Sequence, residues 1–239
     1  MKKYLALLLA LTISAGLFTS CGSKNDTTSS KTTNNTSTVE KTDDKIENAL
    51  TGEAKKEKLK ELNDVAGEEI CAGTMIAIND LDRSDRLKLE KLSEPIDITI
   101  TGEDAVKLAE QENRFKNSKG STFGEKHDYD KISTEGLDLS KQDDAVKYFK
   151  CAIGEVVRYS DKDIKNYTFR VKLQYDPSEM YDDDNNFHVM ALCSEPNVAL
   201  IGAYEYTYNS EEFHKKTAEI TDINSKEADE IFTWGEDNK

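Results

Sequence analysis

The chain lacks the short motifs that mark the commonest catalytic sites. Its 239 residues contain no C-x-x-C, no G-x-S-x-G, no S-x-x-K and no H-E-x-x-H. These absences argue against thioredoxin-like, serine-hydrolase and zinc-peptidase chemistry. The three histidines, His127, His188 and His214, are widely separated, and a lone histidine is usually a surface or hydrogen-bonded residue. We therefore expect neither a metal site nor a cofactor.

Cysteine is scarce, and Cys71, Cys151 and Cys193 are the three that follow residue 44. Either one disulfide with one thiol or three reduced thiols is consistent with this odd number. His188 and Cys193 are the nearest His–Cys pair, but they lie five residues apart on one expected strand, so they point to opposite faces. Cys151 lies off the apolar stripe of its expected helix, so it is either exposed or meets a second layer. We interpret all three as structural cysteines.

Positive charge is in short supply, with 32 Lys and Arg against 47 Asp and Glu, a formal net charge of −15. The first 44 residues have a net charge of +1, so residues 45–239 have a formal net charge of −16. So acidic a domain repels nucleic acid and anionic lipid, which excludes both as expected partners of this part. Two acidic stretches, 79–86 and 181–187, offer oxygens that suit Ca²⁺, but neither has EF-hand spacing. We interpret both as solvated turns.

The amino end has no apolar run long enough to cross a bilayer, which takes about 20 residues. Met1-Lys2-Lys3 followed by the short apolar run 4–13 predicts a secretory signal peptide over residues 1–20. At its end, Phe18-Thr19-Ser20-Cys21 resembles the lipobox of bacterial lipoproteins. The resemblance implies a diacylglycerol on the Cys21 thiol and cleavage just before it. It therefore implies a membrane partner reached through a lipid anchor, on the extracytoplasmic face of the cell membrane.

The segment that follows is almost entirely Ser, Thr, Asn and charged residues. Residues 21–44 contain Val39 as their only large apolar side chain, too little to offset the entropy of folding. We expect a disordered tether with a mean span of about 25–30 Å. Residues 45–239 then form a single extracytoplasmic domain, and their number is ample for one hydrophobic core.

The first part of this domain mixes helical and strand-like patterns. Residues 54–69 are rich in helix formers with apolar residues at helical spacing, which predicts an amphipathic helix. The apolar run 70–78, ICAGTMIAI, is typical of a buried strand. We expect a turn over 79–86. Leu87, Leu89 and Leu92 fit either a strand or a short helix.

A clear alternation follows. Ile96, Ile98 and Ile100 alternate with polar residues, which predicts a half-buried strand. Thr101 then opens a capping pattern for a helix over about 103–115. The next stretch, 117–139, lacks a period, and a loop of this length is either functional or poorly ordered.

The second half is dominated by strands. Ser140 is the expected cap of a strong helix ending near Tyr159, whose apolar stripe has the helical period. Strands are expected over 167–175, 187–193 and 197–208, with a Pro196 turn joining the last two.

The carboxyl end predicts one more strand and one more helix. Ala218, Ile220 and Asp222 alternate, which indicates a strand over 217–223. Residues 228–234 fit a helix capped by Ser225. Helices grouped before consecutive strands favour an α+β fold in which helices pack on an antiparallel sheet meander.

Tyrosines recur on the expected strands. Tyr204, Tyr206 and Tyr208 share one strand face, and Tyr167 and Tyr175 share a face of another strand. Such a face would suit contact with a sugar or a peptide. The alternative is cross-strand aromatic packing under the long helix, which sheets use widely, and we favour that interpretation.

The expected function is therefore a lipid-anchored cell-surface protein that acts as a non-enzymatic binding or interaction module. Its ligand is a protein or a cell-wall component that the sequence does not identify. The alternative is an envelope hydrolase with its site in the 117–139 loop, using His127, Asp128 or Asp130. Replacing His127 with alanine would then remove activity and leave folding intact.

Overall fold

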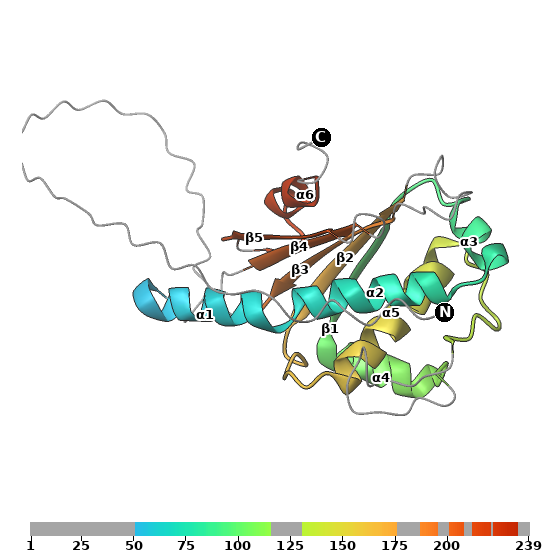
Figure 1. Ribbon diagram of the computed structural model, residues 1–239, viewed down its shortest axis with the longest axis horizontal. Coiled ribbons are helices and arrows are strands. Elements are labelled where there is room, and N and C mark those ends of the chain that lie inside the picture. Colours follow the sequence, from blue (N-terminus) through green and yellow to red (C-terminus); the bar gives the residue numbers. More distant parts are fainter. Residues whose placement is uncertain are drawn as a thin grey trace, which may run out of the picture. The chain divides into compact units, whose positions relative to one another are not determined.

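The computed structural model describes residues 51–115, 131–175, 187–195, 201–207, 212–220 and 222–233. These residues belong to one compact unit, residues 45–239. Their helices and strands (Figure 1) are α1 Gly52–Val65, α2 Gly67–Asp80, α3 Arg83–Leu89, β1 Ile96–Thr101, α4 Gly102–Glu112, α5 Gln142–Tyr159, β2 Thr168–Tyr175, β3 Phe187–Ser194, β4 Ile201–Thr207, β5 Glu212–Ala218 and α6 Lys226–Phe232.

The strands form one antiparallel sheet in the order β1-β2-β3-β4-β5. The expected α+β class with helices packed on an antiparallel meander is therefore confirmed. The strand 96–100 becomes the edge strand β1, which pairs with β2 although α4 and α5 separate the two in sequence.

The two faces of the sheet are covered by different helices (Figure 1). We call the face that packs against α2 and α5 the inner face and the face beneath α6 the outer face. Alternate residues of each strand point to the same face, so Phe169, Val171 and Leu173 of β2 all enter the inner core. This core also holds the apolar stripe that was predicted for the long helix, Ala145, Phe149, Ala152, Ile153 and Val156.

Helix α4 forms a further layer behind α5. Its approach is very close at Gly154, where a Cβ would lie 2.0 Å from the backbone oxygen of Ala105. Cys151 is buried on the same helix, so its position off the apolar stripe reflects this second layer and not exposure to solvent.

Helix α2 corrects the predicted strand over 70–78. The run lies between the sheet and α5, so apolar residues occur on most sides of the helix and the helical period is hidden. Thr74 is also buried, and its hydroxyl donates to the carbonyl of Ile70 one turn earlier (2.7 Å). A short apolar run bounded by polar residues fits a strand or a buried helix equally, and here it is a helix.

The predicted turn over 79–86 is wrong in extent. Helix α2 continues to Asp80 and α3 begins at Arg83, so only Leu81 and Asp82 link them. The Asp82 carboxylate accepts a hydrogen bond from the Asp85 amide (2.8 Å) and so caps α3. Of the two alternatives for Leu87 and Leu89, the short helix is the one observed.

Helix caps were predicted correctly at two of three places. Thr101 and Ser225 each accept a hydrogen bond from the backbone amide three residues later, at α4 and α6. Ser140 does not cap α5, whose N-cap is Lys141 without a side-chain hydrogen bond. The Ser140 hydroxyl instead donates to the Asp138 carboxylate in the preceding turn (2.7 Å).

The last strand begins and ends earlier in the sequence than predicted. β5 covers residues 212–218, and the predicted strand over 217–223 is wrong beyond Ala218. Ile220 and Ile223 belong to an apolar cluster under α6, so their spacing reflects packing in a connection and not a strand. The 187–193 and 197–208 strands do pair as predicted, as β3 and β4, while the Pro196 turn lies outside the described residues.

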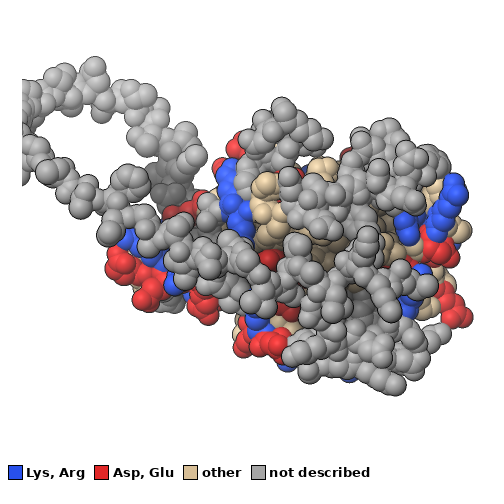
Figure 2. All heavy atoms as spheres, in the orientation of Figure 1, with Lys and Arg blue, Asp and Glu red and all other residues tan. Residues whose placement is uncertain are grey.

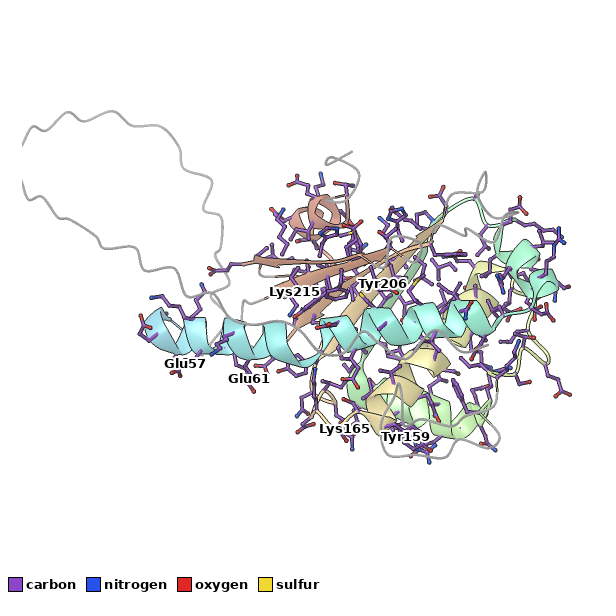
Figure 3. The ribbon with its side chains drawn as sticks, viewed as in Figure 1. Glu57, Glu61, Tyr159, Lys165, Tyr206 and Lys215 are labelled. Carbon is purple, nitrogen blue, oxygen red and sulfur yellow. The ribbon has the colours of Figure 1, made fainter. Side chains whose placement is uncertain are left out.

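Helix α1 carries charges of both signs on its surface (Figure 2). Glu53 pairs with Lys56 and Lys58 with Glu61, each three residues apart. Glu57 and Glu61 lie on the side of α1 that points away from the sheet (Figure 3). Among the described residues, no helix has the length and apolar character needed to cross a membrane.

Candidate functional site

The three cysteines of the domain are buried thiols. Burial raises the pKa of Cys151 to about 11 and holds the pKa values of Cys71 and Cys193 well above that of an ordinary thiol. The Sγ atom of Cys71 lies 3.7 Å from the backbone oxygen of Tyr204, in the inner core. Of the two alternatives, the structure has three thiols and no disulfide among them. A neutral buried thiol is a poor nucleophile, in agreement with a structural role.

The tyrosine face is largely closed. Tyr204 is completely buried on the inner face, where a Cβ on Gly67 would lie 1.7 Å from its ring. Tyr206 (labelled in Figure 3) is half-buried. Its ring centroid lies 6.3 Å from that of Phe213. Tyr167, the residue before β2, is also buried.

The interpretation of Tyr204 as a packing residue is therefore confirmed. The helix that covers it is the start of α2, not the long helix α5 as predicted. Tyr208 and the side chain of Tyr175 lie outside the described residues.

Two other predicted sites fall mainly outside the described part of the chain. His127, Asp128 and Asp130 all lie in the undescribed segment 116–130, and residues 181–186 of the acidic stretch 181–187 lie in a second undescribed segment, 176–186. In the 79–86 segment, Asp85 accepts from the Thr134 hydroxyl (2.7 Å) and from Lys88 (2.6 Å). Within the described ranges, no three or more His, Cys, Asp or Glu side chains are grouped to hold a metal ion.

The outer face of the sheet is divided into two chemically different halves. One half is apolar. In it Met190 and Leu192 of β3 and Ile201 and Ala203 of β4 pack against residues of α6 and of the segment before it, namely Ile220, Ile223, Ala228, Ile231 and Phe232. The other half is polar, and we give the name polar half to six of its residues, Lys172, Gln174, His188, Glu205, Thr207 and His214; Lys216 of β5 lies on the same face, opposite Ala203. These six positions share the outer face because they alternate with inner-face residues along β2 to β5.

Arg170 holds α6 in place beside the polar half. Its Nε atom lies 3.0 Å from each carboxylate oxygen of Asp97, and its Nη1 atom lies 2.8 Å from Asp229 on α6. It also donates to the carbonyl of Ile223 (3.3 Å) and lies 5.1 Å from the centroid of the Phe232 ring. These contacts tie two strands to α6 and so determine where the apolar half ends.

Glu205 is the most unusual residue of the polar half. Its side chain is only 7% exposed, although a carboxylate is costly to bury without a partner. The Oε1 atom lies 3.4 Å from Nδ1 of His188, which is 27% exposed. The Thr207 hydroxyl lies 3.4 Å from the same nitrogen. The His188 imidazole therefore turns its Nδ1 edge toward the buried carboxylate and its Nε2 edge away from it.

This geometry does not make a nucleophile–base–acid triad. A triad needs the hydroxyl on one ring nitrogen and the carboxylate on the other, so that a proton can pass through the base. Here Thr207 and Glu205 both approach Nδ1. The arrangement suits recognition of a ligand by the outward edge of His188 and its polar neighbours.

Sequence reasoning placed His188 and Cys193 on opposite faces, and this is confirmed. Cys193 belongs to the inner core, and His188 pairs with Thr207 on the outer face. The importance of Glu205 was missed, because it was one of 47 acidic residues. The strand period could have identified it. Positions 205 and 207 alternate with Tyr204 and Tyr206, so the side chain of Glu205 is expected on the face opposite the tyrosines.

No family model, no curated protein and no solved structure matches the chain.

Proposed function

We propose that this chain is a lipid-anchored, non-enzymatic binding module on the extracytoplasmic face of a bacterial cell membrane. The polar half of the outer face is its contact surface. Among the described elements, α6 is the helix that packs on this face, and its apolar contacts end at Met190. The division of one sheet face into a helix-covered and a polar half is the observation that carries the proposal.

The amino end supports the location. The lipobox-like stretch ending at Cys21 supplies an anchor, and two or more acyl chains hold a protein durably at a membrane. The Ser/Thr/Asn-rich residues 21–44 supply a tether, so the domain reaches partners beyond the lipid headgroups. The partner is a protein or a cell-wall component.

The composition of the polar half supports binding. It combines a cation, an amide, a hydroxyl and imidazoles, several of them half-exposed, around one buried carboxylate. In a domain with a formal charge of −16, Lys172, His188 and His214 gather basic groups on one surface. Such a mixed surface gives a partner several directional hydrogen bonds, which is how specificity is set.

Site-specific photo-crosslinking in cells tests this surface. A crosslinking residue at Gln174, in the polar half, is expected to capture a discrete partner. The matched control is Lys162, an exposed position between α5 and β2, beside the inner-face layer. Capture at Gln174 but not at Lys162 supports the proposal. Equal capture at both sites, or none at either, contradicts it.

A further inference from the structure

The apolar cluster beneath α6 is separate from the inner core. Among the described residues, the two clusters share no member, because they lie on opposite faces of the sheet. Along β3, Val189 and Ala191 belong to the inner core, whereas Met190 and Leu192 belong to the outer cluster. Helices α2 and α5 pack on the sheet from the inner face. Detachment of α6 therefore leaves the inner core intact, as local opening of a single element does.

Helix α6 occupies the outer face in the way that a bound peptide would. It has seven residues, and isolated helices shorter than about 12 residues are marginal in water, so its helical form depends on docking. Its buried side chains are Ala228, Ile231 and Phe232, and the other four residues of the helix are exposed. Anchors at positions i, i+3 and i+4 are the pattern by which an amphipathic helix binds the surface of another protein.

The charges of α6 complement those of the face on which it lies. The helix has one lysine against three acidic residues, a net charge of −2. The basic side chains of the sheet on this face are Arg170, Lys172 and Lys216. The Nη1 atom of Arg170 lies 2.8 Å from Asp229, and the ammonium of Lys172 lies 5.5 Å from the centroid of the Phe232 ring. The face therefore suits an acidic helix, although the domain as a whole is strongly acidic.

Two carboxylates of the sheet lie on the same face, and each contacts a basic side chain. Asp97 lies 3.0 Å from Nε of Arg170, and Glu205 lies 3.4 Å from Nδ1 of His188. Their contacts leave the charge at the place where α6 lies basic.

We propose that the face beneath α6 binds an acidic amphipathic helix of a partner protein, which displaces α6. We call this face the docking face and define it by its apolar floor and its two basic groups: Met190, Leu192, Ile201, Ala203, Arg170 and Lys172. The partner helix carries an acidic residue in the place of Asp229 and an aromatic residue three positions later, in the place of Phe232. The inference rests on the proposed function, because it extends the contact surface from the polar half to the adjoining apolar half and makes the partner a protein.

Fluorescence anisotropy with a labelled synthetic peptide of residues 225–233 tests the docking face. The protein is the full chain in detergent with Cys21→Ser. Its own α6 competes with the peptide, so the parent binds weakly. Phe232→Ala in the chain removes an anchor of α6 and leaves the docking face unchanged, so it should bind the peptide at least about 10-fold more tightly than the parent.

A second variant keeps the test valid if Phe232→Ala does not fold. The Asp229 side chain is half-exposed, so Asp229→Asn should fold as the parent does while it loses the pairing with Arg170. It should bind the peptide at least about 3-fold more tightly than the parent. A peptide that itself carries Phe232→Ala is the control ligand and should bind none of these chains.

The matched control chain is Gly67→Ala, which disturbs the inner face at Tyr204. It should bind the peptide no more tightly than the parent. An equal gain in Gly67→Ala, or no gain in Phe232→Ala and Asp229→Asn, overturns the inference. Parent dimers that the peptide dissociates would make α6 of a second copy the occupant and would also overturn it.

The crosslink at Gln174 separates this inference from the proposed function. A crosslink that forms at Gln174, together with variants that gain no peptide binding, overturns the displacement of α6 alone. Absence of the crosslink overturns the contact surface itself.

Discussion

Arg170 of β2 reaches diagonally across the sheet to Asp97 of β1, and its Nε lies 3.0 Å from each carboxylate oxygen. The guanidinium is nine-tenths buried, because the Phe232 ring of α6 covers it. One side chain therefore links the sheet edge to the helix that divides the outer face.

Replacing Arg170 should loosen α6 and destabilise the domain. Arg170→Ala removes a paired guanidinium and its contacts with the strand and the helix, so we expect a loss of roughly 2–4 kcal/mol in the free energy of unfolding. Urea denaturation measures it. Lys172→Ala, which loses only a contact with the same ring, should cost about 0.5–1 kcal/mol. An equal loss in the free energy of unfolding for the two variants would show that Arg170 does not join α6 to the sheet.

The start of α2 depends on a glycine. A Cβ at position 67 would overlap the Tyr204 ring, so Gly67→Ala should cost roughly 1–3 kcal/mol, as overpacking in a core does. The double variant Gly67→Ala with Tyr204→Ala should cost clearly less than the sum of the single changes, because the clash is gone. Additive costs, measured by denaturation, would exclude the clash as the cause.

Stability should depend on the ionisation of Glu69. Burial raises its pKa above the ordinary value, and the Ser160 hydroxyl donates to it (2.8 Å). A raised pKa means that its contribution to stability is present below the unfolded pKa and is lost as the pH rises through the folded pKa. Glu69→Gln removes this ionisation and keeps an acceptor. Its melting temperature should exceed the parent's at pH 7 by more than at pH 4; a difference independent of pH would contradict this.

The domain thiols should be inert while the chain is folded. In the Cys21→Ser variant, Cys71, Cys151 and Cys193 are all buried with raised pKa values, so a thiol reagent at pH 7.5 should react slowly. Three thiols should react after denaturation without a reductant. A count of one thiol would reveal a disulfide that the structure does not have.

Local chemistry made much of the fold predictable. The alternation over 167–175 predicted β2, and Thr101 and Ser225 predicted two helix caps. These signals are carried by adjacent residues, so they survive without knowledge of the fold.

The errors occurred where tertiary packing decides the structure. The 70–78 run is apolar on most sides because a sheet and a helix enclose it, and that environment is not visible in the sequence. The candidate site was missed for a similar reason. Glu205 gains its meaning from strand register, which brings His188 and His214 to it from 17 and 9 residues away in sequence. Its residue type alone does not set it apart from the other acidic residues of the chain.

The anchor at Cys21 is the part of the account on which the location of the contact surface depends. Metabolic labelling with radioactive palmitate tests it most directly, comparing the wild-type chain with Cys21→Ser in the native host. The account predicts label on the wild-type chain in the membrane fraction, and none on Cys21→Ser, which keeps the three domain cysteines as an internal control. An unlabelled wild-type chain, or label retained by Cys21→Ser, would contradict it.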